Sequence, residues 1–126
     1  MKHAEPTPTV RAARGAITVD RDEREAVLDA TDRLLRELLQ GNEIEPADVV
    51  SVVFTATGDL RSVFPAEAAR RMGMADVPLL CARELDIEGS MPSVVRVLMH
   101  FHTVRPRSEV VHVYLEGARS LRDDLA

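Results

Sequence analysis

The chain has 126 residues, and its 16 Lys and Arg against 21 Asp and Glu give a net charge of −5. This length predicts one compact domain with its own core, and 45% hydrophobic with 29% charged residues argues against disorder. An acidic chain lacks the basic surface that nonspecific nucleic-acid binding needs, and a single Cys excludes an internal disulfide.

The first nine residues, MKHAEPTPT, contain two prolines and no apolar run. We expect residues 1–9 to form a flexible leader outside a single domain of residues 10–126. The leader lacks the apolar core of a signal peptide, and no apolar stretch approaches the roughly 18 residues of a membrane span. We therefore expect a cytoplasmic protein with no membrane partner.

Residues 10–18 (VRAARGAIT) predict a first strand. Gly15 within this strand is typical of a bulge or of a close backbone approach to a ligand. The next element is a helix over about residues 22–40, because one apolar stripe recurs there at helical spacing. The stripe consists of Val27, Thr31, Leu34, Leu35, Leu38 and Leu39.

The ends of that helix have their own signals. Asp20 is predicted to be the N-cap, and Glu23, three residues later, is the expected partner in a capping box. Gly41 and Asn42 follow the last apolar residue and predict the end of the helix. Both signals make this long helix the clearest element of the sequence.

Residues 48–57 (DVVSVVFTAT) are rich in β-branched side chains and predict a buried strand. Pro65 and Gly73 are placed to begin and end a short helix over residues 66–72. Further strands are predicted at residues 79–82, 94–103 and 110–115. The order strand, helix, strand, helix, strand, strand, strand indicates an α/β (α+β) fold, in which two helices pack on a mixed sheet.

Common catalytic motifs are missing from the sequence, which has no glycine-rich phosphate loop, nucleophile elbow or zinc-ligand cluster. His100 and His102 share one face of a predicted strand and could bind a metal with His112 or a carboxylate. Exposed strand histidines are nevertheless the more common outcome of such spacing. Cys81 could be a nucleophile, but a lone cysteine is more often a structural thiol. We predict a site without metal or cofactor.

Two arginines, Arg14 and Arg96, lie inside apolar strands, where a charge is costly to bury unless it is paired or faces a wet cleft. Arg96 could pair with Glu84 or Glu116, or could lie on an outer sheet face. Alternatively, both arginines bind a carboxylate-bearing ligand, because the planar guanidinium matches a carboxylate with two parallel bonds. Tyr114 could then add one neutral donor.

Several motifs in a fixed order together resemble the AroH class of chorismate mutase. They cover the chain from about residue 10 to its end. The matching segments are RAARGAITV from Arg11, ATGDL from Ala56, VFPA from Val63, Val77-Pro78 with Cys81 and Glu84, Arg96-Val97, and HVYLE from His112 with Leu121-Arg122.

This resemblance implies the rearrangement of chorismate to prephenate on the route to phenylalanine and tyrosine. It also implies a homotrimer shaped like a closed barrel, with each site between two subunits. Arg14, Glu84 and Arg96 would be the catalytic residues. Further substrate contacts would come from Cys81 and Tyr114, from Phe64 and Arg70 of the adjacent subunit, and from Leu121 and Arg122 in a C-terminal segment that covers the site.

The sequence departs from the family at its periphery. Glu67 stands where family members carry a lysine beside the Phe-Pro-Ala turn, which puts one substrate-attracting contact in doubt. Leu80 replaces a residue that can be polar, and the covering tail is short. A competing interpretation is a small α/β module that binds such a ligand without converting it, because a fold does not settle a function.

Overall fold

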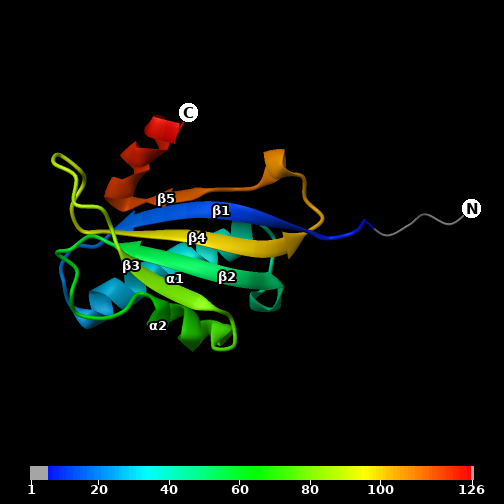
Figure 1. Cartoon of the computed structure of the whole chain (residues 1–126), viewed down its shortest axis with the longest axis horizontal. Coiled ribbons are helices and arrows are strands. Elements are labelled where there is room, and N and C mark those ends of the chain that lie inside the picture. The colour runs from blue at the N-terminus through cyan, green and yellow to red at the C-terminus, as the bar shows by residue number, and fades with distance from the viewer. Residues whose placement is uncertain (1–5, 126) are drawn as a thin grey trace, which may run out of the picture.

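The computed structural model describes residues 6–125, with side chains described as far as residue 121. Its centre is a five-stranded sheet in the order β3-β2-β4-β1-β5 (Figure 1). β4 runs antiparallel to both β1 and β2, whereas β3 and β5 run parallel to their single neighbours. The strands are β1 (Thr9–Thr18), β2 (Val49–Ala56), β3 (Leu79–Arg83), β4 (Val94–Thr103) and β5 (Val113–Leu115).

The helices α1 (Arg24–Gly41) and α2 (Ala66–Ala69) lie against one face of this sheet (Figure 1). The core forms between them, where side chains such as Leu34, Phe54 and Phe101 have no exposed surface. The mixed sheet with two helices confirms the predicted fold class. α2 is shorter than predicted and continues as an irregular turn over Arg70–Met74, in which Gly73 has a φ of 98°.

Gly15 shows how closely α1 packs on the sheet. A Cβ atom at Gly15 would lie 3.0 Å from Cδ1 of Leu34 and 3.1 Å from Cδ1 of Leu38. The predicted close approach is therefore real, but the approaching group is the helix and not a ligand. A larger residue here would push α1 away from β1.

Two predicted boundaries are wrong, and both depend on distant partners. α1 begins after Glu23 with no side-chain cap, so Asp20 is not its N-cap. The neighbouring carboxylate, Asp22, instead accepts hydrogen bonds from the backbone N–H groups of residues 61 and 62. β5 begins at Val113, not at residue 110, because the Asn42 amide binds both backbone groups of Val111 and replaces the strand ladder there.

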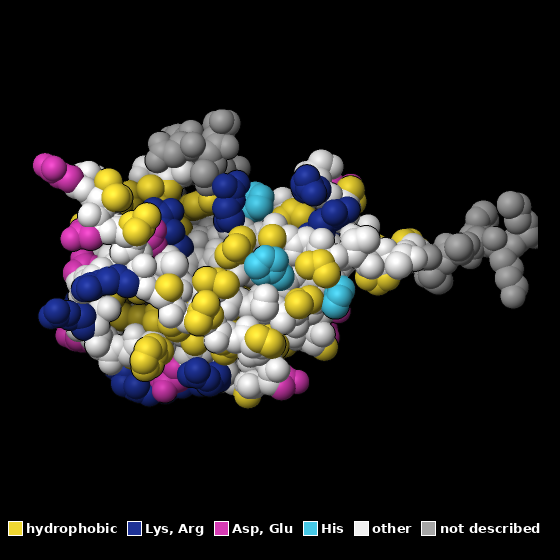
Figure 2. Space-filling model, viewed as in Figure 1, with side chains coloured by type: hydrophobic (Ala, Val, Ile, Leu, Met, Phe, Trp, Pro, Cys, Tyr) yellow, Lys and Arg dark blue, Asp and Glu magenta, His cyan; other side chains and the backbone are white. Residues whose placement is uncertain are grey.

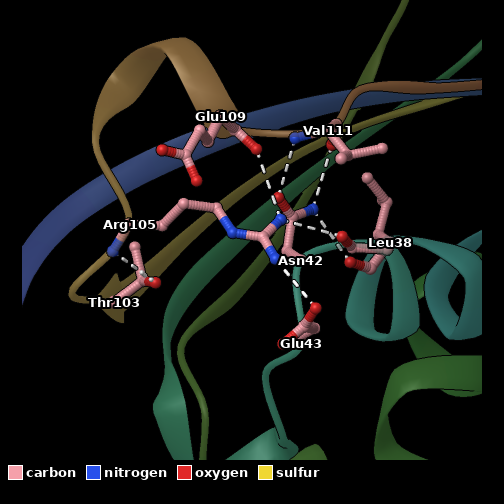
Figure 3. A network of polar contacts seen from close by, with 8 residues as sticks. Leu38, Asn42, Glu43, Thr103, Arg105, Glu109 and Val111 are labelled. Atoms are coloured by element: carbon pink, nitrogen blue, oxygen red, sulfur yellow. Dashed lines mark hydrogen bonds and ion pairs between the residues drawn. The ribbon is translucent and has the colours of Figure 1, made fainter.

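Asn42 belongs to a polar network at the C-terminal end of α1 (Figure 3). Its side chain is 1% exposed and donates to the carbonyl oxygens of Leu38 and Val111 at 2.9 Å. Arg105 completes the network by donating to the carbonyl oxygens of Gly41 and Glu109. This network fastens the connection between β4 and β5 to the helix.

On the opposite face of the sheet, residues 6–125 place no long α-helix (Figure 1). Figure 2 shows this face, where hydrophobic and histidine side chains lie among arginines. A 3₁₀ helix, Glu116–Leu125, covers part of this face. It packs Ala118 against Ala16 of β1 and Val94 of β4. No helix in the described part of the chain has the length and apolarity needed to cross a membrane.

Candidate active site

A row of residues across the open face forms the base of the candidate site. The strand pairings align Thr55 of β2 with Arg96 of β4, Arg96 with Ala16 of β1, and Ala16 with Tyr114 of β5. Directly paired residues point to the same face of a sheet. Arg14 lies two residues before Ala16, so that its side chain shares this face as well.

All of these residues except Ala16 line a hollow of about 440 Å³ on the open face. Its lining brings together four predicted site residues from four separate segments: Arg14, Glu84, Arg96 and Tyr114. Thr55 and the apolar side chains of Val53 and Leu98 complete it. The small side chain of Ala16 leaves room beside Arg96 on the open face. The strand register, rather than any local motif, therefore assembles this group.

Glu84 directly follows β3, and its N–H extends the pairing with β2 by donating to the carbonyl oxygen of Ala56 at 2.9 Å. Its Oε1 lies 2.9 Å from Nε of Arg96, and its Oε2 accepts a hydrogen bond from the Thr55 hydroxyl. The ion pair that the sequence allowed for Arg96 is thus made with Glu84. Glu116, the other candidate, pairs with Arg33 instead.

The Arg96 guanidinium is close to Glu84 but poorly aligned with it. Its Nε is buried and has no acceptor in hydrogen-bonding geometry among the described residues. The charges therefore attract each other without an aligned N–H···O bond at Nε. An unsatisfied buried donor is costly, so Arg96 keeps hydrogen-bonding capacity that the described residues do not use.

Arg14 has an exposed side chain, but its backbone is held by His112. The Arg14 N–H donates to Nδ1 of His112 at 2.9 Å. This acceptor role requires a neutral imidazole with its proton on Nε2. Burial, and then the Arg14 charge, lower the pKa of His112 below its usual value. Both effects favour the neutral ring that the hydrogen bond needs.

A second hollow, of about 540 Å³, lies beside the first. It contains Phe64, Arg70 and Cys81, and the first hollow contains none of them. Phe64 is 71% exposed, which is unusual for so large an apolar side chain. Thr55 borders both hollows. The structure therefore divides the predicted site residues of one chain into two groups.

Glu67 lies on the rim of this second hollow, and its carboxylate is paired with two arginines. Arg24 donates a hydrogen bond to Oε2 of Glu67, and Arg71 approaches the same oxygen at 3.5 Å. Arg24 also lines the hollow. Four arginines in total, Arg24, Arg61, Arg70 and Arg83, border it, so the surroundings of this acidic residue remain basic.

The remaining predicted residue with a described side chain, Leu121, adjoins the row at Ala16. Leu121 packs against the small cluster of Ala16, Val94 and Ala118, and the Arg122 side chain lies outside the described residues. Nδ1 of His100 is 3.2 Å from the Ser51 hydroxyl. Among the described residues, no group of three or more His, Cys, Asp or Glu side chains could hold a metal ion.

Sequence reasoning missed Thr55. Its only signal was a hydroxyl side chain within the apolar run VVSVVFTA. The resulting constellation offers two guanidinium groups, one carboxylate and one phenol. It can bind a dianion and stabilise developing charges. Such a set can act without a nucleophile or a proton relay.

Known proteins resemble this chain in sequence and in fold. A family model described as "Chorismate mutase type I" matches residues 10–125. A chorismate mutase AroH from Thermus thermophilus is 51% identical over 117 residues, 92% of this chain and 96% of that protein. The Bacillus subtilis (strain 168) chorismate mutase AroH is 42% identical over 118 residues, 93% of each chain. The solved structure of a Clostridium thermocellum chorismate mutase aligns with a TM-score of 0.86 at 40% identity, covering 87% of this chain and 98% of that one.

Proposed function

The chain belongs to the chorismate mutase type I family, and from this premise we propose that the hollow on the open face is where it rearranges chorismate to prephenate. Chorismate mutase activity is the function of the chain, and it lies on the route to phenylalanine and tyrosine. We assign the reaction to this hollow because four residues converge there: Arg14, Glu84, Arg96 and Tyr114.

The reaction makes two demands on the protein. It is an intramolecular rearrangement of a dianion, in which a C–O ether bond breaks while a C–C bond forms. The substrate must be held in a compact conformer, so that the reacting carbons lie close together. Negative charge that grows on the ether oxygen must also be stabilised. No proton is transferred, so the site needs neither a base nor a nucleophile.

Binding the compact conformer is the role we assign to Arg14 and Tyr114. The Arg14 guanidinium can bind a substrate carboxylate with two parallel hydrogen bonds. Tyr114 can donate a further bond from its phenol. Because the backbone of Arg14 is anchored to His112, its guanidinium is presented from a fixed strand. Less conformational freedom is then lost when the substrate binds.

Stabilising the transition state is the role we assign to Arg96, with Glu84. Arg96 would donate to the ether oxygen as its charge develops. A preorganised donor of this kind is worth about 3–4 kcal/mol in the transition state. Glu84 would accept a bond from the substrate hydroxyl and face the positive charge that develops on the ring. Its contact with Arg96 supports this arrangement, since it holds the two charges in place before substrate binds.

The separation into two hollows supports a site shared between subunits of a homotrimer. Phe64, Arg70 and Cys81 lie outside the hollow that holds the four charged and polar residues. We propose that Phe64 and Arg70 of one subunit close the first hollow, which contains Arg96, of the next subunit. The exposure of Phe64 and the open sheet face support this, because a closed trimer would bury both. A cytoplasmic location stays a prediction.

Mixed trimers test the shared site. Neither Arg96→Ala nor Arg70→Ala protein should be active alone, because each lacks one half of every site. Co-expressed at equal levels, the two variants would form intact sites at about one quarter of the interfaces. Chorismate consumption, followed by ultraviolet absorbance, should recover accordingly. If co-expression restores no activity, the site is not shared in this way.

The absorbance assay also tests the activity of the chain directly. Purified protein should consume chorismate far faster than the spontaneous rearrangement, with Arg96→Ala as the matched blank. Binding without turnover would indicate the competing ligand-binding module. Full activity in the presence of EDTA is expected, because no step in this mechanism passes through a metal.

A further inference from the structure

The Glu84 carboxylate contacts two different groups through its two oxygens. Oε1 lies 2.9 Å from Arg96 Nε, and Oε2 accepts the hydrogen bond from Thr55 Oγ1. An arginine and a carboxylate otherwise favour a paired arrangement with two parallel hydrogen bonds. In this site that arrangement does not form, since the Nε bond is poorly aligned.

Thr55 is held firmly enough to impose this geometry. It lies within β2, where it is paired with Arg96 of β4 on one side and with Ala82 of β3 on the other. Both neighbouring strands thus fix its backbone. Since β3 leads directly into Glu84, the same register also sets the distance between the hydroxyl and the carboxylate.

We propose that Thr55 is a positioning residue for the rearrangement, because its hydroxyl engages one oxygen of Glu84 and keeps the carboxylate from closing on Arg96. Without this hydroxyl, Glu84 rotates and forms the doubly bonded pair. The Arg96 N–H groups then donate to Glu84 and can no longer donate to a substrate oxygen. This inference rests on the proposed roles of Arg96 and Glu84.

The test removes the hydroxyl and preserves the shape. Thr55→Val should lower kcat about tenfold, the order expected for a hydrogen bond to a charged group. KM should change less than twofold, because the carboxylate contacts of Arg14 and Tyr114 remain. Thr55→Ser keeps the hydroxyl and should restore kcat to within about twofold. Thr55→Ala should match Thr55→Val in kcat even if the two differ in thermal stability.

Ser51 provides the matched control. It lies on the same face of β2, four residues before Thr55, and its hydroxyl contacts His100 rather than Glu84. Ser51→Ala removes a hydroxyl from the same strand face and should leave both kcat and KM unchanged. If Ser51→Ala lowers kcat as much as Thr55→Val, any disturbance of β2 has this effect and the inference is wrong.

A double-mutant cycle separates this inference from the proposed function. In a Glu84→Ala background, Thr55→Val should cost less than about twofold in kcat, because its partner is already gone. A full tenfold cost in that background would overturn the inference, as would normal kcat in Thr55→Val alone. If Glu84→Ala and Arg96→Ala both retain normal activity, the assignment of the site itself fails.

Discussion

Two arginines of this chain have opposite environments. Arg105 lies in the connection between β4 and β5, beside the C-terminal end of α1. Its side chain is only 18% exposed and donates to the carbonyl oxygens of Gly41 and Glu109 (Figure 3). Arg96, on the open sheet face, is 39% exposed and has a buried Nε with no aligned acceptor. The first arginine uses its donors within the fold, and the second keeps donors available.

This contrast separates stability from activity. The Asn42–Arg105 network satisfies buried polar groups, so its loss should be measured in the free energy of unfolding. The Arg96 hollow leaves groups unsatisfied, so its loss should be measured in catalysis. Variants that affect both quantities equally in either region would break this distinction.

The largest expected effect is on catalysis at Arg96. Arg96→Ala should lower kcat at least about 100-fold, because it removes the donor at the developing oxyanion. The melting temperature at matched concentration should change little, since partly exposed ion pairs add at most about 1 kcal/mol. Arg96→Lys should also be strongly impaired, because a lysine lacks the planar fork. Near-normal kcat in Arg96→Ala would contradict the assigned role.

The next effect is on stability at Asn42. Asn42→Ala removes bonds to Leu38 and to both backbone groups of Val111. We expect a loss of about 2–3 kcal/mol in the free energy of unfolding, measured by urea denaturation. The kcat of the folded variant should stay within about twofold of normal. Gln40→Ala, at an exposed position in the last turn of the same helix, is the control and should cost less than about 0.5 kcal/mol.

Within the same hollow, Arg14 is expected to affect substrate binding. If Arg14 mainly binds a ground-state carboxylate, Arg14→Ala should raise KM at least as much as it lowers kcat. The expected rise is about tenfold or more, the order of a lost charge-assisted bond. Arg36→Ala, on the helical side of the molecule, removes the same charge and should leave KM unchanged. An unaltered KM in Arg14→Ala would count against the binding role.

The smallest expected effect concerns pH. Because the pKa of His112 is lowered in the folded state from 6.5, the unfolded chain binds more protons there at mildly acidic pH. This contribution to stability is complete above pH 6.5 and is lost as the pH falls through the lower folded value. It should stay well under about 1 kcal/mol, because the ring is partly solvated.

His112→Asn tests that contribution, since an amide oxygen can still accept from Arg14 but cannot be protonated. Its free energy of unfolding should fall less than that of the unaltered chain between about pH 8 and pH 5. Parallel curves would refute the linkage.

The pH profile of kcat is a separate test. Between about pH 6 and pH 8, kcat should vary little, because no proton moves in the reaction. A bell-shaped profile of kcat with two limbs in this range would favour acid–base chemistry.

Local patterns predicted most of the fold. The strand predicted over residues 94–103 coincides with β4, and the apolar stripe predicted α1. The errors occurred where a distant side chain forms hydrogen bonds with the backbone. Asn42 shortens β5 from 69 residues away. Beside the predicted N-cap Asp20, Asp22 accepts a hydrogen bond from a loop 39 residues further on, and α1 has no side-chain cap. Such partners leave no local signature.

For the candidate site, the sequence drew attention to some of the residues that the structure brings together. Arg14 and Arg96 stood out because a charge inside an apolar strand needs an explanation. Thr55 did not stand out, because a threonine is ordinary in a strand. Its contact with Glu84 depends on the pairing of β2 with both β3 and β4. The separation of Phe64 and Arg70 from the first hollow likewise follows only from the three-dimensional arrangement.

The lengths of the strands have a consequence for self-association. β1 and β4, with ten residues each, occupy the interior of the sheet, whereas the borders are β3 with five residues and β5 with three. Short borders give an incoming backbone few free N–H and C=O groups to pair with, which disfavours ribbon growth and fibril formation. The short borders therefore lower the risk that an exposed strand edge pairs with the backbone of another chain.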